Sequence, residues 1–469
     1  MSQIFISAAH KSSGKTTVTL GLCAALRARG LKVRPFKKGP DYIDPMWLGR
    51  AAGHTCHNLD FFTQSREEIR ETVGYYAQGS DIALVEGNKG LYDGLDLDGS
   101  NSNAALAKLL DAPVVLVLDA RGMTRGIAPL ILGYQAFDTD IRIAGVILNQ
   151  LGGSRHETKL RAVIEHYTDV RVIGAVARSE EMQILERHLG LIPSNEQDDA
   201  VARIETIGRS IASQVDLDSL IDIAASGALP PAPESAPCSI APLDRPLRIG
   251  IARDEAFGFY YPGDLQAMQD AGAELVAIDT LRDGRLPDID GLFIGGGFPE
   301  SCMQQLQDNV SLRQAIAAAI EAGLPVYAEC GGLMYLSRSL SWQGQTCEMV
   351  GCIPGDTVMH ARPQGRGYVR LAATDAHPWP GRDGEIRAHE FHYSSLDNLE
   401  TPAGFAFRVL RGAGIDGSHD GYIYKNLLAC YTHQRTTGSN RWSEHFLEFV
   451  SACKTGQHPT HTRHSEQQG

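Results

Sequence analysis

The stretch Ala9-His10-Lys11-Ser12-Ser13-Gly14-Lys15-Thr16-Thr17 has the residue order of a phosphate-binding loop. It follows an apolar segment, residues 4–6, that is expected to form a strand, and it opens an amphipathic segment, residues 18–26, that is expected to form a helix. In such a loop the N–H groups of the helix N-terminus hold phosphate, the lysine reaches the β and γ oxygens, and the threonine binds Mg²⁺. Ala9 departs from the pattern, which has glycine there. We predict an ATP site formed by Ser12, Ser13, Gly14, Lys15, Thr16 and Thr17, with Thr16 on the metal.

Length and composition place the chain among ordinary globular proteins. Its 469 residues are 43% hydrophobic and 21% charged, which allows two to four domains. We expect a cytoplasmic protein without a membrane partner, because no run approaches the roughly 18 apolar residues of a membrane span and no signal peptide is visible at the N-terminus. A formal charge of −13 argues against a nucleic-acid partner.

A proline-rich segment divides the sequence. Residues 226–246 contain six prolines among small residues, a composition that favours an extended linker. We predict a domain over residues 1–225, a second over 247–453, and a disordered polar tail over 454–469. On both sides of the linker, short apolar runs alternate with helical stretches, as in parallel α/β sheets. We therefore predict two doubly wound α/β domains, with their sites at the carboxyl ends of the strands.

Two acidic loops follow predicted strands near the phosphate-binding loop. Asp41 and Asp44 lie after the strand at residues 32–36, and Glu86 and Asp93 lie after the strand at residues 82–85. Carboxylate oxygens suit Mg²⁺, although each pair taken alone is more often a turn or a helix cap. Their joint position beside a nucleotide loop favours a metal and substrate site.

The second half contains a sharp turn around a cysteine. Glu329-Cys330-Gly331-Gly332 follows the apolar run at residues 326–328 and precedes a helical segment. A nucleophile elbow needs small neighbours, and a following helix N-terminus favours the thiolate, so Cys330 is a candidate nucleophile. The alternative is one more buried cysteine. The partner base would be a histidine from elsewhere in the fold.

Ordered motifs along nearly the whole chain resemble the cobyrinic acid a,c-diamide synthases. The motifs include Lys38-Gly39-Pro40-Asp41-Tyr42-Ile43-Asp44-Pro45, Gly90-Leu91-Tyr92-Asp93-Gly94, Glu186-Arg187-His188-Leu189-Gly190-Leu191, Gly295-Gly296-Gly297-Phe298-Pro299-Glu300 and His389-Glu390-Phe391-His392-Tyr393-Ser394. The resemblance implies an N-terminal P-loop domain related to dethiobiotin synthetase and a C-terminal class I glutamine amidotransferase domain that lacks the full triad. It also implies the activity of a carbon–nitrogen ligase. Such an enzyme uses ATP, Mg²⁺ and L-glutamine to amidate the a and c acetates of cobyrinic or hydrogenobyrinic acid, a tetrapyrrole polycarboxylate, through acyl phosphates.

The resemblance also assigns roles to individual residues. Cys330 and His433 would hydrolyse glutamine, and Arg435 stands where complete triads have glutamate, so nothing in the sequence explains how His433 is oriented. Asn149 would contact the adenine edge. The remaining assignments are the metal contacts Thr16, Asp41 and Glu86, the substrate contacts Asp44, Asp93, Lys38 and Lys89, and the oxyanion hole Gly296, Gly297 and Gly331.

Two alternatives stay open at this point. Trp47, Phe61 and Phe62 differ from the small residues expected in a corrin enzyme, which leaves siroheme or a sirohydrochlorin as the acceptor. A P-loop ATPase that acts only as a switch would need neither Cys330 nor His433. His389 and His392 do not form the His-Glu-x-x-His zinc motif, and no function is assigned to the histidines of the tail. The oligomeric state is open, with a homodimer among the options.

Overall fold

The computed structural model describes residues 2–182, 184, 186–187, 190–196, 199–380, 384–400 and 404–456. Its internal contacts divide the chain into two compact units, Met1–Pro237 and Cys238–Gly469, and the boundary falls inside the proline-rich segment. Helix α13, Trp442–Thr455, extends two residues beyond the predicted end of the second domain. The rest of the predicted tail lies outside the described residues, as do His188 and Leu189 of the family motif.

The first unit is built on a seven-stranded parallel sheet in the order β3-β2-β4-β1-β5-β6-β7. Its strands contain the predicted apolar runs, and the five residues of β4 are all buried. The strands are β1 Ser2–Ala8, β2 Val33–Lys38, β3 His57–Leu59, β4 Ile82–Glu86, β5 Val114–Asp119, β6 Ile143–Leu151 and β7 Val172–Ala177. This topology confirms the predicted P-loop type of α/β fold.

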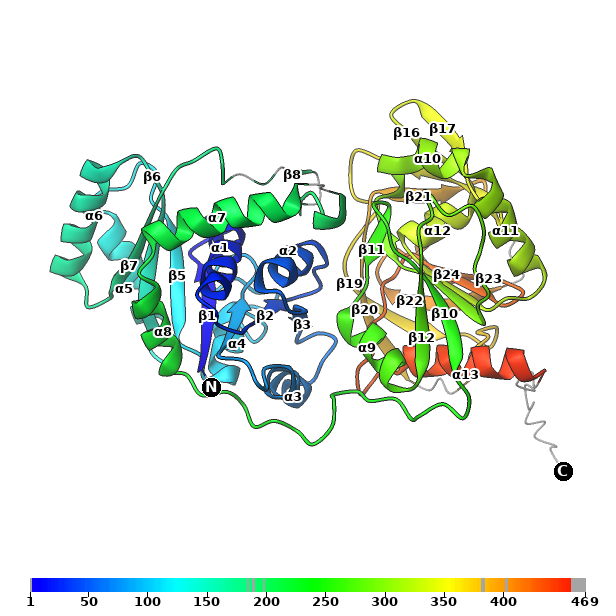
Figure 1. Cartoon of the computed structure of the whole chain (residues 1–469), viewed down its shortest axis with the longest axis horizontal. Coiled ribbons are helices and arrows are strands. Elements are labelled where there is room, and N and C mark those ends of the chain that lie inside the picture. The colour runs from blue at the N-terminus through cyan, green and yellow to red at the C-terminus, as the bar shows by residue number, and fades with distance from the viewer. Residues whose placement is uncertain are drawn as a thin grey trace. The chain divides into compact units, whose positions relative to one another are not determined.

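Helices connect these strands, and several begin at residues that cap helix N-termini. Ser65 forms a capping box with Glu68 at the start of α3, and Ser102 caps α4. In Figure 1, α7 lies across α1 and α2, which it contacts. The helices are α1 Lys15–Ala28, α2 Ile43–Ala52, α3 Arg66–Tyr76, α4 Asn103–Leu110, α5 Ile127–Phe137, α6 Ser154–Tyr167, α7 Ala200–Gln214 and α8 Leu217–Ala225, and β8 Glu186–Arg187 pairs with β9 Gly190–Leu191.

The second unit contains a nine-stranded mixed sheet in the order β12-β10-β13-β15-β24-β23-β22-β19-β20. The strands from β12 to β24 in this order are parallel, as predicted, whereas the others add as antiparallel neighbours that the sequence analysis did not anticipate. The strands are β10 Leu247–Ala252, β12 Ala273–Ile278, β13 Gly291–Ile294, β15 Val326–Glu329, β19 Gly365–Ala373, β20 Glu385–His392, β22 Phe405–Arg411, β23 His419–Tyr424 and β24 Leu427–Cys430.

Smaller elements complete this unit. The short strands β11 Phe257–Phe259 and β14 Gly296–Gly297 pair beside the large sheet, and β16 Ser337–Trp342, β17 Gln345–Glu348, β18 Ile353–Met359 and β21 Ser394–Asp397 form a four-stranded sheet. An aromatic cluster of Phe293, Tyr327, Trp442 and Phe446 forms part of the core. The helices are α9 Pro262–Asp270, α10 Met303–Asp308, α11 Val310–Glu321, α12 Gly331–Leu336 and α13. Among the described residues, no helix combines the length and the apolar character needed to cross a membrane.

Candidate active sites

The predicted nucleotide loop lies between β1 and α1, at the carboxyl edge of the first sheet. Ser12 has φ +66° and Gly14 has φ +77°, in the left-handed region that favours glycine. A Cβ atom at Gly14 would lie 2.2 Å from Nδ2 of Asn149, so this turn also requires a residue without a side chain. Lys15 is buried, Ser12 is exposed, and Thr16 and Thr17 are half-buried in the first turn of α1. The loop therefore has the backbone shape that exposes N–H groups to phosphate.

Asn149 joins the end of β6 to this loop. It lies opposite Asp119 in the register of β5 and β6, and its Nδ2 atom donates to the backbone oxygen of Ser13 over 2.8 Å. Ser13 Oγ in turn donates to the oxygen of His10 over 2.8 Å. The side chain of Asn149 thus holds the phosphate-binding loop in this structure, and its adenine contact stays a prediction.

Buried charges converge where β1, β2 and β4 end. Lys37 on β2 lies opposite Glu86 on β4, and its Nζ forms direct ion pairs with Glu86 and Asp44. Lys15 Nζ lies 3.4 Å from the same Glu86 oxygen. Burial lowers the pKa of Lys15 and opposes the charge of Lys37, but Asp44 and Glu86 raise the pKa of Lys37 well above its usual value. Although burial raises the pKa of Glu86, the two lysines lower it to about 2. Glu86 is therefore a carboxylate at neutral pH.

Oxygen donors gather around Thr16 within this cluster. Thr16 Oγ1 lies 3.1 Å from Glu86 Oε1 and 3.3 Å from Asp44 Oδ2. The second oxygen of Glu86, Oε2, is buried and has no hydrogen-bond partner. Among the described residues, no group of three or more histidine, cysteine, aspartate and glutamate side chains is arranged to hold a metal ion. A hydroxyl and two carboxylates, one of them with a buried unpartnered oxygen, nevertheless fit the hard-oxygen preference of Mg²⁺.

Asp41 occupies a different place from the other predicted metal contacts. Its Oδ1 accepts from the backbone N–H groups of Ile43 and Asp44 at the start of α2, over 3.0 and 3.1 Å, and its Oδ2 lies 3.8 Å from Lys37 Nζ. Asp44, predicted as a substrate contact, is the residue that approaches Thr16. The geometry therefore favours Asp44 over Asp41 for the position beside the metal.

Of the remaining predicted substrate residues, Lys38 is the last residue of β2, and Lys89 and Asp93 lie on the loop after β4. Lys38 is buried, its Nζ lies 3.5 Å from Asn88 Oδ1, and burial lowers its pKa to about 8. Lys89 is exposed, whereas Asp93 accepts from the N–H of Gly90 over 2.9 Å and so closes the turn between them. These residues flank the charged cluster, and their substrate contacts stay predictions.

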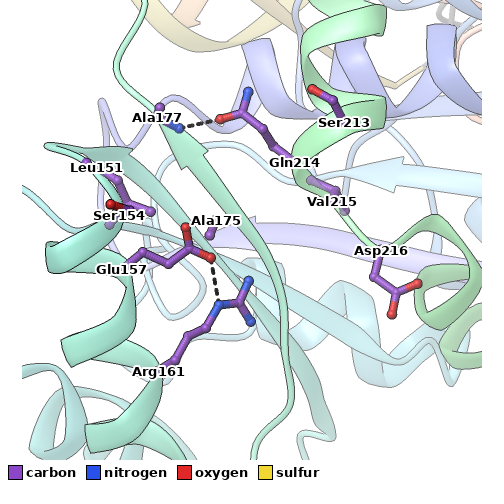
Figure 2. A pocket seen from close by; sticks show the side chains of 11 residues that line it. Leu151, Ser154, Glu157, Arg161, Ala175, Ala177, Ser213, Gln214, Val215 and Asp216 are labelled. Carbon is purple, nitrogen blue, oxygen red and sulfur yellow. Dashed lines mark hydrogen bonds and ion pairs between the residues drawn. The ribbon is translucent and has the colours of Figure 1, made fainter.

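A surface pocket of about 500 Å³ opens beside the edge strand β7, between α6 and the end of α7. Figure 2 shows that Glu157 faces Arg161 across one wall, with a 2.8 Å ion pair, and that Gln214 accepts from the N–H of Ala177. The lining includes none of the predicted nucleotide, metal or substrate residues. Glu157 and Arg161 pair with each other, and the carboxylate of Asp216 accepts from Ser219 as the cap of α8, so we assign this pocket no role in the reaction.

In the second unit, Cys330 forms the predicted elbow between β15 and α12. Its φ is +49° and its ψ is −100°, a strained conformation for a residue with a side chain. Its N–H donates to the oxygen of Cys430 over 2.7 Å, which fixes the turn against β24. A strained cysteine at the carboxyl end of a central parallel strand is the arrangement expected for a nucleophile.

His433 follows β24 and lies beside Cys330. Burial lowers its pKa, but hydrogen bonding to Cys330 and Glu329 outweighs burial and raises the pKa to about 10. Nδ1 of His433 lies 3.3 Å from Oε2 of Glu329, a residue to which the sequence analysis gave no role. The signal for Glu329 was its place directly before the nucleophile, at the end of an apolar strand.

The predicted oxyanion-hole glycines lie against these two residues. A Cβ atom at Gly296 would lie 2.6 Å from Cε1 of His433, and a Cβ atom at Gly331 would lie 3.0 Å from the N atom of Gly297. The backbone of β14 therefore approaches both the elbow and the base. This closeness allows backbone N–H groups of the three glycines to point at one oxyanion, and the oxyanion hole of Gly296, Gly297 and Gly331 stays a prediction.

His389 supports the base from the other side. Its backbone exchanges two hydrogen bonds with His433, and the two rings stack with their centroids 5.0 Å apart. Burial and the neighbouring His433 lower the pKa of His389 well below its usual value, so this ring is neutral. Arg435, at the position of a triad glutamate, lies over the ring of Tyr261 at 5.1 Å from its centroid.

Comparisons with known proteins find matches to both halves of the chain. Residues 2–183 match the model of an AAA domain, and residues 248–441 match that of the CobB/CobQ-like glutamine amidotransferase domain. A protein of Magnetococcus marinus described as cobyrinate a,c-diamide synthase is 48% identical, over 95% of this chain and 97% of that protein. Proteins of the same description from Methanosarcina acetivorans and Archaeoglobus fulgidus are 42% and 41% identical, over 92% of this chain and 92% and 93% of theirs.

Proposed function

This chain belongs to the cobyrinate a,c-diamide synthase family, and from that membership we propose that it uses ATP and L-glutamine to amidate the a and c acetates of cobyrinic or hydrogenobyrinic acid. The observation that carries the glutamine half of the proposal is the strained Cys330 with His433 beside it. We assign residues 1–225 to the amide synthase domain, 226–246 to a linker and 247–453 to the glutamine domain. We place the reaction in the cytoplasm, which contains both ATP and glutamine.

In the glutamine site, Cys330 is the nucleophile and His433 is the acid and base. The Cys330 thiolate attacks the amide carbon of glutamine, and N–H groups of Gly297 and Gly331 stabilise the oxyanion. The carbon–nitrogen bond then breaks as the His433 imidazolium gives its proton to the leaving nitrogen, which departs as ammonia. Water hydrolyses the remaining thioester, with His433 as the base, and releases glutamate.

In the synthase site, the first unit activates a carboxylate that ammonia alone would not attack. The loop N–H groups and Lys15 hold the ATP phosphates, and Lys38 and Lys89 orient the acidic substrate. A substrate carboxylate oxygen attacks the γ phosphorus, and ADP leaves. Ammonia then attacks the carbon of this acyl phosphate, and inorganic phosphate departs. Thr16, Glu86 and Asp44 would hold Mg²⁺, which would supply positive charge to neutralise the phosphates.

Siroheme is the competing acceptor. The structure weakens the part of the case for siroheme that rested on Trp47. Trp47 is fully buried, and its indole nitrogen donates to the oxygen of Ile192 over 2.9 Å. It therefore packs within the domain rather than against a macrocycle. Phe61 and Phe62 are half-buried, so the part of the case for siroheme that rests on these two residues stays open to test.

The experiment offers cobyrinic acid and siroheme in separate reactions with ATP, Mg²⁺ and glutamine, and counts amidations by mass spectrometry. We expect two amidations of cobyrinic acid, two ATP hydrolysed and none of either with siroheme. Conversion of siroheme alone would overturn cobyrinic acid as the proposed substrate. Conversion of neither compound would overturn the proposed enzymatic activity. Cys330→Ala should lose glutamine-dependent turnover but retain turnover with ammonium chloride, which separates the two sites.

A further inference from the structure

The carboxyl group of Glu329 is surrounded by hydrogen-bond donors in the glutamine site. Its Oε1 accepts from the hydroxyl of Tyr327 over 2.7 Å and from the N–H of Gln434 over 2.8 Å, while its Oε2 faces Nδ1 of His433 at 3.3 Å. All four residues are buried. Because an ionised carboxylate accepts hydrogen bonds and donates none, it satisfies all three donors at once, with the proton of His433 on Nδ1.

The chain places this carboxylate by the register of its strands. Glu329 lies opposite Cys430 in the pairing of β15 and β24, and His433 follows Cys430 by three residues. The segment after β24 therefore passes back over the end of β15, where Glu329 and Cys330 are adjacent. The two donors on Oε1 fix the rotamer that points Oε2 at the imidazole.

We propose that Glu329 is the positioning residue of the glutamine site, completing a Cys330–His433–Glu329 triad whose carboxylate comes from the nucleophile's own strand. It takes the role that Arg435 cannot fill two residues after the histidine. By accepting from Nδ1, Glu329 leaves Nε2 to exchange a proton with the Cys330 thiol, and its charge stabilises the imidazolium that results. The inference rests on the proposed glutamine hydrolysis.

Glu329→Gln is the direct test, because it keeps the shape and removes the charge. The amide oxygen can still accept from Tyr327 and Gln434, but the amide NH₂ then faces Nδ1 and favours the tautomer with the proton on Nε2. That tautomer cannot take the thiol proton. In serine proteases the equivalent aspartate-to-asparagine change lowers kcat by about 10⁴-fold. We expect kcat for glutamine hydrolysis to fall at least about 100-fold, with ammonia-dependent amidation of cobyrinic acid within about twofold of the wild type.

A second readout separates positioning from a merely structural role. The rate at which iodoacetamide alkylates Cys330, followed on its own peptide by mass spectrometry, reports thiolate across pH. The titratable groups near the thiol and its base include His433, Glu329, the neutral His389 and Tyr431. Asp264 and Arg435 also act electrostatically on this part of the site. In Glu329→Gln the alkylation profile should move to higher pH by about one unit or more. Glu348→Gln, the same chemical change at an exposed position of β17 in the same unit, should leave the profile in place.

The results for Glu329→Gln and Cys330→Ala separate the role of Glu329 from the proposed glutamine hydrolysis. Glutamine hydrolysis within about threefold of the wild type in Glu329→Gln, or a loss without any movement of the alkylation profile, would overturn the role of Glu329. Retention of glutamine use by Cys330→Ala would instead overturn the proposed function. Should Glu329→Gln fail to fold, nitrogen-15 spectra of the wild type decide, recorded above the His433 pKa of about 10, where the ring is neutral. The inference predicts that neutral His433 keeps its proton on Nδ1, and a proton on Nε2 instead would refute it.

Discussion

Lys37 and Glu86 lie directly opposite each other on the parallel strands β2 and β4, and their side chains form a buried ion pair beside the phosphate-binding loop. Both side chains are at most 2% exposed. A buried pair of this kind contributes little net stability, because desolvation offsets the attraction, but removing one partner leaves an uncompensated charge. Its value here is to keep Glu86 ionised next to Thr16.

Glu86→Gln should therefore abolish the synthase reaction and destabilise the first unit. The variant removes the carboxylate that faces Thr16 and leaves Lys37 and Lys15 with one anionic partner fewer, at a cost of about 3–5 kcal/mol. We expect ammonia-dependent amidation to fall at least about 100-fold while glutamine hydrolysis persists. Rate assays with ammonium chloride and with glutamine, beside thermal melting, check this. Glu67→Gln, at an exposed position in the first turn of α3, is the matched control and should change neither rate. If Glu86→Gln kept its amidation activity, Glu86 would not belong to the synthase site.

Asp44 and Asp41 offer a paired test of which carboxylate serves the metal. Asp44→Asn weakens an oxygen beside Thr16, so the Mg²⁺ concentration for half-maximal amidation should rise about tenfold or more. Asp41→Asn should shift it much less, because asparagine also accepts from the N–H groups of Ile43 and Asp44. Magnesium titrations of both variants with ammonia as the nitrogen donor measure the difference. The reverse order would restore the original assignment of Asp41.

The sequence was sufficient to locate the strands β1, β2 and β4 beside the phosphate-binding loop, but it did not indicate the short strand β3. Periodicity located β4 and β5, because strands buried on both faces are continuous apolar runs. Periodicity could not show that Lys37 is buried between Asp44 and Glu86, since that contact depends on the register of strands 49 residues apart. For the same reason, the sequence could not rank Asp44 ahead of Asp41.

In the second unit the elbow was predictable but the orientation of its base was not. Gly331 and Gly332 after a short apolar run marked Cys330, and the family motif marked His433. Glu329 was not predicted, because the carboxylate of a complete triad usually follows the histidine in the sequence. Here the pairing of β15 with β24 brings a carboxylate from the strand of the nucleophile next to the histidine. The antiparallel strands of the large sheet also escaped, because parallel strands elsewhere in the chain dominated the pattern.

Gly296→Ala should damage glutamine use without touching the synthase. The new methyl group would lie 2.6 Å from Cε1 of His433, a separation that forces the imidazole to move. We expect glutamine-dependent amidation to fall about tenfold or more, with the ammonia-dependent rate unchanged, in parallel assays of the two nitrogen donors. Gly263→Ala is the control in the same unit, because its methyl group would meet no atom within 4 Å. Equal loss with both nitrogen donors would instead indicate general unfolding.

A buried carboxyl group next to the glutamine site predicts how stability changes with pH. Asp264 on α9 accepts from the N–H of Thr436 over 2.8 Å and from the indole nitrogen of Trp442 over 3.1 Å. Burial raises its pKa to about 7, with Glu329 adding to the effect and Arg435 opposing it. Since an unfolded aspartate titrates near about 4, the folded protein alone holds this proton in the window between these values.

The free energy of unfolding should accordingly fall as pH rises through that window. The stabilisation by Asp264 is present below about pH 4 and is lost above about pH 7, because between these pH values the folded state binds more protons than the unfolded state. Compared with Asp264→Asn, the wild type should therefore lose up to about 4 kcal/mol between pH 4 and pH 8. In Asp264→Asn the asparagine NH₂ group faces the indole N–H of Trp442. The cost of this contact between two donors is the same at every pH, so it shifts the free energy of unfolding without changing its slope. Urea unfolding of both proteins at several pH values, followed by tryptophan fluorescence, measures the slope, and Asp270→Asn at an exposed position of the same helix should reproduce the wild-type slope. Parallel slopes for wild type and Asp264→Asn would show that Asp264 is ionised in the folded protein throughout this range.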